Sequence, residues 1–243
     1  MKIIVVFKWS RNPQDARVGV DGTVNWQGVK MAANDDDPTA MEIACSIADG
    51  GEVIGLTVND GDAAWAAARG AARTVMISDA QTDVNSSVTG SVLAAAIRRV
   101  EGVDAVLIGD SAWDYGVVSA LAGQLGWPAV AGVVSAMKGQ DCLRVTRKMG
   151  SASQVLEVKG PVVLAVSASR AEQNVPGMKE VLAARKKPVE KLILADLGLT
   201  PETTVNSKGT RFPDTPPARI IDGSDPMTAC EQLVAALRAD GVL

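Results

Sequence analysis

The first half of the sequence alternates short apolar runs with amphipathic, alanine-rich segments. Runs rich in β-branched residues, which are typical of strands buried on both faces, occupy residues 2–7, 52–58, 74–77 and 104–108. Apolar residues recur at helical spacing in segments 39–48, 60–73, 88–99 and 116–126. Strands and helices that alternate at this spacing predict an α/β fold, in which a parallel sheet is flanked by helices.

The pattern changes after Pro128. Four apolar runs separated by Gly and Lys turns predict an antiparallel extension with strands at 131–137, 143–148, 154–158 and 162–166. A helix is expected over 177–185, before Lys186-Lys187-Pro188. We expect one domain over 1–200, which includes the segment 177–188, and an extended Pro-rich arm with a closing helix over 201–243. The apolar stripe of that helix either packs back on its own domain or clasps a partner, and it contains Met227, Cys230, Leu233, Val234 and Leu237.

Composition excludes several function classes. The chain has no histidine, which removes His-based triads and His metal sites. Its 24 basic and 28 acidic residues give a net charge of -4, so no general attraction to nucleic acid is expected. Three widely spaced cysteines and no signal or membrane segment favour a reducing, cytoplasmic compartment. No metal site and no catalytic residue is predicted, because no nucleophile has an evident base.

A ligand of such a sheet binds beyond the carboxyl ends of the strands. Three segments would reach that edge: 8–15, 59–62 and 110–116, the last reading DSAWDYG. The acidic run at 34–37 precedes a helix, and it is interpreted either as a capping cluster or as a metal or nucleotide contact. Neither standard glycine-rich phosphate loop is present.

Four segments in this order resemble one family: KIIVVFKW at the start, NDDDPTAME at 34–42, LIGDSAWD at 107–114 and MKEVLAARKKP at 178–188. The sequence resembles the beta subunits of electron-transfer flavoproteins, most closely the FixA-like branch. The resemblance implies an adenine-nucleotide alpha-hydrolase-like fold. It also implies an electron carrier that is not an enzyme by itself, and that pairs with an alpha subunit holding most of the FAD.

The same resemblance implies further partners and sites. Electrons would come from an acyl-CoA-type or other flavin dehydrogenase and pass to a downstream oxidoreductase, and the C-terminal arm would clasp the alpha subunit. Met178 would anchor the dehydrogenase, with Lys179, Leu182 and Arg185 beside it. AMP is a second ligand of such subunits, and the positions expected to bind a cofactor are Val6, Phe7, Lys8, Asn34, Asp37, Val58, Asn59, Gly109, Asp110, Asp114, Val117, Val118, Ser119 and Ala120.

Two departures from the family pattern count against AMP. Val117 and Val118 stand where the family has polar residues, and Asp35 and Asp36 replace a Pro and an aromatic residue. Two other functions stay open: a bifurcating half with its own FAD, and a stand-alone nucleotide-binding sensor. We also expect the segment 8–15 to face the partner's flavin.

Overall fold

A computed structural model describes residues 1–59, 61–81, 85–110, 115–168, 175–200, 208–215 and 218–243. The chain divides into two compact units, which are described separately. The first contains Met1–Arg17 and Val24–Lys208, and the second contains Val18–Thr23 and Gly209–Leu243. The predicted boundary between residues 200 and 201 stays a prediction, because 201–207 lie outside the described residues.

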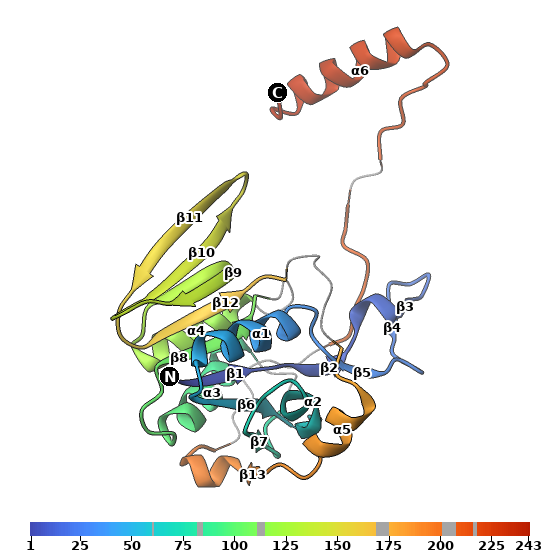
Figure 1. Ribbon diagram of the computed structural model, residues 1–243. Coiled ribbons are helices and arrows are strands. Elements are labelled where there is room, and N and C mark those ends of the chain that lie inside the picture. Colours follow the sequence, from blue (N-terminus) through green and yellow to red (C-terminus); the bar gives the residue numbers. More distant parts are fainter. Residues whose placement is uncertain (60, 82–84, 111–114, 169–174, 201–207, 216–217) are drawn as a thin grey trace. The chain divides into compact units, whose positions relative to one another are not determined.

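The first unit is built on one sheet with the strand order β11-β10-β9-β12-β8-β1-β6-β7-β13 (Figure 1). Its parallel part runs from β9 to β13 in that order. These strands are β1 (Lys2–Val6), β6 (Glu52–Val58), β7 (Arg73–Ile77), β8 (Ala105–Gly109), β9 (Ala129–Lys138), β12 (Val162–Val166) and β13 (Val189–Leu192). The predicted α/β class is therefore confirmed.

The central strand β1 shows how the layers form. Ile3, Val5 and Phe7 are buried on one face with residues of α1, whereas Ile4 and Val6 are buried on the other face with residues of α3 and α4. Because neighbouring side chains of a strand point to opposite faces, an unbroken apolar run needs cover on both sides. The helices of this unit are α1 (Asp37–Ala48), α2 (Ala63–Ala68), α3 (Ser86–Arg98), α4 (Tyr115–Leu125) and α5 (Met178–Ala184), with 3-10 turns η1 (Pro13–Asp15) and η2 (Leu194–Leu197).

The helix predicted over 60–73 is wrong in length, because α2 covers only Ala63–Ala68. Gly70 has a φ of +113°, a conformation that ends a helix and suits glycine. A Cβ at this position would lie 2.5 Å from Cys45 Sγ, so the turn also packs closely on α1. Within α2, Trp65 stacks on Phe7 with ring centroids 5.0 Å apart, and the Arg69 guanidinium lies 4.4 Å above the Trp65 ring.

The predicted antiparallel extension is present in part, because the run 162–166 forms β12, which pairs parallel with β8 and β9 and belongs to the parallel part of the sheet. Strands β10 (Leu143–Met149) and β11 (Ala152–Val158) form a hairpin that continues the sheet beyond β9 (Figure 1). Arg144 and Glu157 form an ion pair across it at 3.1 Å. Within the described part of the chain, no strand pairs with the outer side of β11, which leaves an edge of backbone groups open.

Short strands that the sequence did not predict lie between β1 and α1. They are β2 (Trp9–Arg11), β3 (Arg17–Val18), β4 (Val24–Asn25) and β5 (Met31–Ala33). β2 pairs antiparallel with β5 directly after the carboxyl end of β1. This pairing holds the segment after β1 in an extended form at the ligand edge of the sheet.

The second unit contains the predicted closing helix, α6 (Pro226–Ala239). The Asp225 carboxylate accepts hydrogen bonds from the backbone N–H groups of Met227 and Thr228, both at 3.3 Å, and so caps the helix. No residue of α6 is buried. Among the described helices, none is both long and apolar enough to cross a membrane.

Candidate functional site

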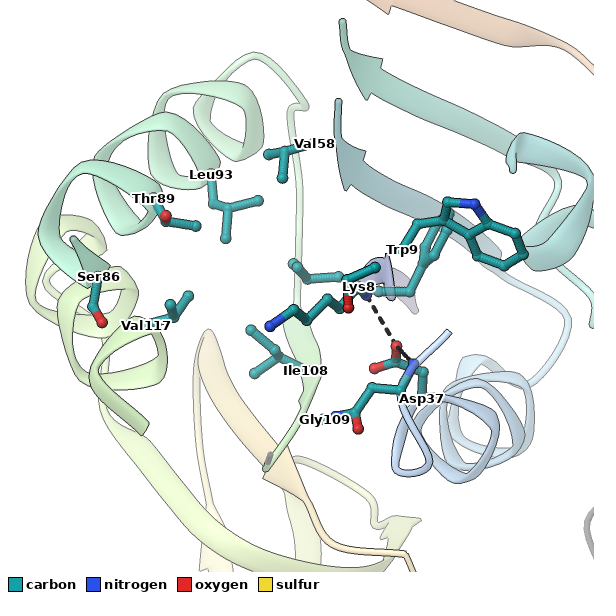
Figure 2. A pocket seen from close by; sticks show the side chains of 14 residues that line it. Lys8, Trp9, Asp37, Val58, Ser86, Thr89, Leu93, Ile108, Gly109 and Val117 are labelled. Atoms are coloured by element: carbon teal, nitrogen blue, oxygen red, sulfur yellow. Dashed lines mark hydrogen bonds between the residues drawn. The ribbon is translucent and has the colours of Figure 1, made fainter. Parts of the chain in front are cut away.

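The carboxyl ends of β1, β6 and β8 surround a cavity of about 110 Å³ (Figure 2). In this sheet the chain leaves β1 toward β6 and returns to the other side of β1 at β8, which is the switch point where α/β folds bind ligands. The helices α3 and α4 and the start of α1 complete the wall. The lining residues are Val6, Phe7, Lys8, Trp9, Ser10, Asn34, Asp37, Val58, Ser86, Thr89, Leu93, Ile108, Gly109 and Val117.

The structure brings together many of the predicted cofactor-binding positions. Eight of the lining residues were predicted: Val6, Phe7, Lys8, Asn34, Asp37, Val58, Gly109 and Val117. They come from five separate stretches of the chain, at residues 6–8, 34–37, 58, 109 and 117, which the fold brings to one edge of the sheet. Whether they hold a cofactor stays a prediction.

The other predicted positions lie elsewhere. Asn59 lines a neighbouring groove, and Val118 is buried in the core between α4 and the sheet. Ser119 is exposed, and Ala120 lies against Gly90 of α3. The Asp110 carboxylate turns to a backbone group of β9. Asp114 lies outside the described residues.

Asp37 is a buried carboxylic acid in the cavity wall. Its Oδ2 accepts hydrogen bonds from the backbone N–H groups of Lys8 at 2.9 Å and Asn34 at 3.1 Å. Burial raises the pKa of Asp37 to about 7, although both hydrogen bonds act in the opposite direction. Asp37 therefore joins the end of β1 to the loop before α1, and its charge changes near neutral pH.

Two further carboxylates join loops at the same edge. Asp36 Oδ1 accepts a hydrogen bond from the Ala168 backbone N–H, after β12, at 2.6 Å. Asp110 Oδ2 accepts one from Gly132 of β9 at 2.9 Å. Partial burial raises the pKa of Asp36, and Asp110 adds to the increase by charge repulsion. No side chain of the acidic run caps α1 by a hydrogen bond, because Asp36 and Asp37 bond to backbone groups of other loops, so the interpretation as a capping cluster is wrong.

Gly109 makes this close approach feasible. A Cβ there would lie 2.8 Å from Asp37 Oδ1 and 3.0 Å from Asp36 Cβ, which is tighter than normal packing permits. The amino end of α1 therefore lies directly against the carboxyl end of β8. Among the described residues there is no group of His, Cys, Asp or Glu side chains suited to a metal ion.

Lys8 and the start of α3 face one another across the cavity. Figure 2 shows the Lys8 side chain extending between Ile108 and the helical wall that carries Ser86 and Thr89. Sequence reasoning did not single out Ser86, Thr89 or Leu93. The two hydroxyl residues could have been found from their position in the first turn of a helix that follows a parallel strand, because such a turn starts at the ligand edge of the sheet.

A second, larger groove of about 590 Å³ adjoins the cavity. It is lined by the segment Lys8–Gln14, by the strand β5 and by Trp26 and Asn59. The segment predicted to face a flavin is therefore one wall of an open groove with two tryptophans, Trp9 and Trp26. Figure 2 shows Trp9 turned away from the cavity.

The predicted docking residues lie on the surface. α5 (Met178–Ala184) buries only Ala184, and it packs against α2. Met178 is 76% exposed and Leu182 is 53% exposed, so neither side chain packs inward. Lys179 and Arg185 are also exposed. The helix presents two large apolar side chains next to positive charge.

A comparison with protein families identifies a family for most of the chain. The model of the family described as "Electron transfer flavoprotein domain" matches residues 21–197. The matched range includes the cavity walls at β6, β8, α3 and α4, and the exposed helix α5. It covers most of the 243 residues.

Proposed function

The chain belongs to the electron transfer flavoprotein domain family, and we propose from this premise that it is the beta subunit, of the FixA-like branch, of a heterodimeric electron carrier. It carries electrons from a flavin dehydrogenase to a downstream oxidoreductase and has no catalytic residues of its own.

The observation that carries this proposal is the uncovered apolar stripe of α6. Within its own unit α6 buries no residue, and Met227 is 72% exposed. Leu233 and Val234 are also exposed on the same stripe. A stripe of this size on a helix of 14 residues needs a cover. We assign that cover to the alpha subunit.

The redox group of the carrier is FAD, held mainly by the alpha subunit, and it supplies the electron uptake and release. From this chain, the groove beside the cavity would face it. Trp9 and Trp26 offer flat apolar surface there, and Lys8 and Arg11 add positive charge. Such a lining fits a ring system that gains negative charge on reduction.

AMP does not fit the cavity. Its volume of about 110 Å³ is below the roughly 300 Å³ at which small-molecule sites begin. Val117 lines the wall where the family pattern has polar groups, and Asp36 places negative charge at the same edge. Lys8 is a cation in the lining, but its side chain extends into the same small space (Figure 2). We therefore assign neither AMP nor a second FAD to this subunit.

The dehydrogenase would dock on α5. Met178 is the most exposed apolar side chain of this helix. A flexible thioether suits a transient contact with a partner surface, and Lys179 and Arg185 would attract acidic groups around it.

Co-expression with the alpha subunit tests the proposal. We expect a 1:1 complex in light scattering, and absorbance spectra that give one FAD per complex. Leu233→Asp should break the complex, whereas Gln232→Asp, on the opposite side of α6, should leave it intact. Two FAD per complex would support the bifurcating alternative, and a stable homodimer without flavin would support the sensor.

A further inference from the structure

The docking helix α5 is too short to set its own orientation. It has seven residues, and isolated helices of this length are unstable in water. Its amino end is held by Glu180, whose Oε2 accepts a hydrogen bond from the Gly177 backbone N–H at 2.6 Å. That bond lies within the helix's own first turn, so it cannot fix the helix on the rest of the unit.

Lys187 supplies a connection to the rest of the unit. Its Nζ donates hydrogen bonds to the backbone carbonyls of Ala67 at 2.9 Å and Ala71 at 2.8 Å. These carbonyls lie in the last turn of α2 and just after it, and the Ala67 carbonyl also accepts a hydrogen bond from the Gly70 backbone N–H at 3.4 Å. A positive charge at the carboxyl end of a helix is also favoured by the helix dipole.

Pro188, the residue after Lys187, connects this segment to the sheet. The Pro188 carbonyl accepts a hydrogen bond from the Thr74 backbone N–H at 3.1 Å, and β13 then pairs with β7. Lys187 therefore lies between a helix that presents a surface and a strand that is fixed in the sheet. Breaking its two hydrogen bonds would release the α5 side of this junction and leave the strand in place.

Lys186 provides a matched control for Lys187. It has the same charge one position earlier, but it is exposed, and its side chain has no partner among the described residues. A general effect of positive charge near α5 would be the same for both lysines. An effect of the α2 connection would be seen for Lys187 alone.

We propose that Lys187 is a positioning residue for the docking surface, because its bonds to Ala67 and Ala71 hold α5 with Met178 and Leu182 turned outward. The inference rests on the proposed function, since it assumes that α5 meets the dehydrogenase. Lys187 itself need not touch the partner.

The test uses the complete heterodimer and a purified acyl-CoA dehydrogenase reduced by its acyl-CoA substrate. Lys187→Gln should raise the KM for the carrier about fivefold and leave kcat within twofold. Lys187→Arg, which can still donate to both carbonyls, should restore the KM, and Lys186→Gln should not change it. Amide hydrogen exchange of residues 178–185 should become about tenfold faster in Lys187→Gln only.

Other outcomes would overturn either the positioning role of Lys187 or the docking function of α5. Equal KM values for Lys187→Gln and Lys186→Gln, or a change in kcat alone, would overturn the positioning role. If Met178→Ala does not change the KM, the docking function of α5 is wrong. Hydrogen exchange then separates the two failures: unchanged exchange in residues 178–185 of Lys187→Gln shows that Lys187 does not hold α5 either, whereas faster exchange shows that Lys187 holds α5 and that only the docking function is wrong.

Discussion

The carboxyl edge of the sheet and the surface of α5 use their side chains in opposite ways. At the edge, the carboxylates of Asp36, Asp37 and Asp110 all bond to backbone N–H groups of this chain. On α5, the apolar side chains of Met178 and Leu182 are largely exposed on the surface of the unit. The edge serves the internal cohesion of the chain, whereas our proposal gives the helix the role of contact with another protein.

This difference separates two kinds of sequence pattern, a polar run at a sheet edge and an apolar pair on a surface helix. A polar run at a ligand edge is easily interpreted as a binding site, but here its polar atoms are already engaged within the fold. An exposed apolar pair on a short helix has no such internal explanation. Changes at the edge should therefore alter stability, and changes on α5 should alter association.

The largest effect is expected for Gly109→Ala. The added Cβ would lie 2.8 Å from Asp37 Oδ1 and 3.0 Å from Asp36 Cβ, so the start of α1 must move. Overpacking of this kind costs about 3 kcal/mol in the free energy of unfolding. Urea unfolding measures it. Gly123→Ala in α4 is the control, since its Cβ would meet no atom within 4 Å, and equal stability of the two variants would show that the edge is loosely packed.

The next effect is the pH dependence caused by Asp37. Its pKa is raised from 3.8 in the unfolded chain to about 7 in the fold, so the folded state holds a proton that the unfolded state loses. The stability contribution is therefore complete below pH 4 and is lost as the pH rises through 7. Between pH 5 and 8 the loss should be about 2 kcal/mol.

Asp37→Asn removes this dependence, because an amide oxygen can accept the same two hydrogen bonds from Lys8 and Asn34. We expect the variant to gain stability over the natural chain as the pH rises from 5 to 8, in urea titrations at each pH. Parallel curves for the two proteins would mean that Asp37 is not the titrating group.

Met178→Ala should weaken association and leave the fold unchanged. Truncation of a central apolar anchor should cost about 1 kcal/mol of binding, which corresponds to a roughly fivefold rise in the dissociation constant for the dehydrogenase. Biosensor titration of the heterodimer measures it. Since the side chain is 76% exposed, the melting temperature should stay the same, and a large drop in it would show that Met178 packs on the fold.

The smallest expected effect is that of AMP on thermal stability. A ligand at a hundred times its Kd stabilises a fold by about 2.7 kcal/mol, which raises the melting temperature by several degrees. With 1 mM AMP we expect no shift in the heterodimer, and no nucleotide released by heat. A shift of several degrees would contradict our conclusion about the cavity and would place a ligand at the edge after all.

The parallel core could be predicted because its strands are buried on both faces. The bounds of β6 and β12 agree with the apolar runs 52–58 and 162–166. β13 was missed, since only its last residue is buried and its middle carries Glu190 and Lys191. An edge strand of this kind has the composition of a loop, and only its pairing with β7 defines it.

The site could be predicted in part for a related reason. Residues that directly follow a predicted strand, such as Lys8 and Gly109, do line the cavity. The bond from Asp36 to Ala168 spans 132 residues, and no local pattern indicates it. Ser86 and Thr89 were missed because they belong to a helix, whose contribution depends on where the crossover brings its first turn.

The open outer strand β11 has a practical consequence for handling the protein. Two copies could join edge to edge and extend the sheet, as unpaired strands tend to do. Arg147 and Lys148 of the adjoining strand give each hairpin a net positive charge that opposes this encounter, since Arg144 is paired with Glu157. Dissolved salt screens that repulsion over about 8 Å at physiological ionic strength. Concentrated stocks should therefore keep best in dilute buffer, and turbidity should rise as sodium chloride is added.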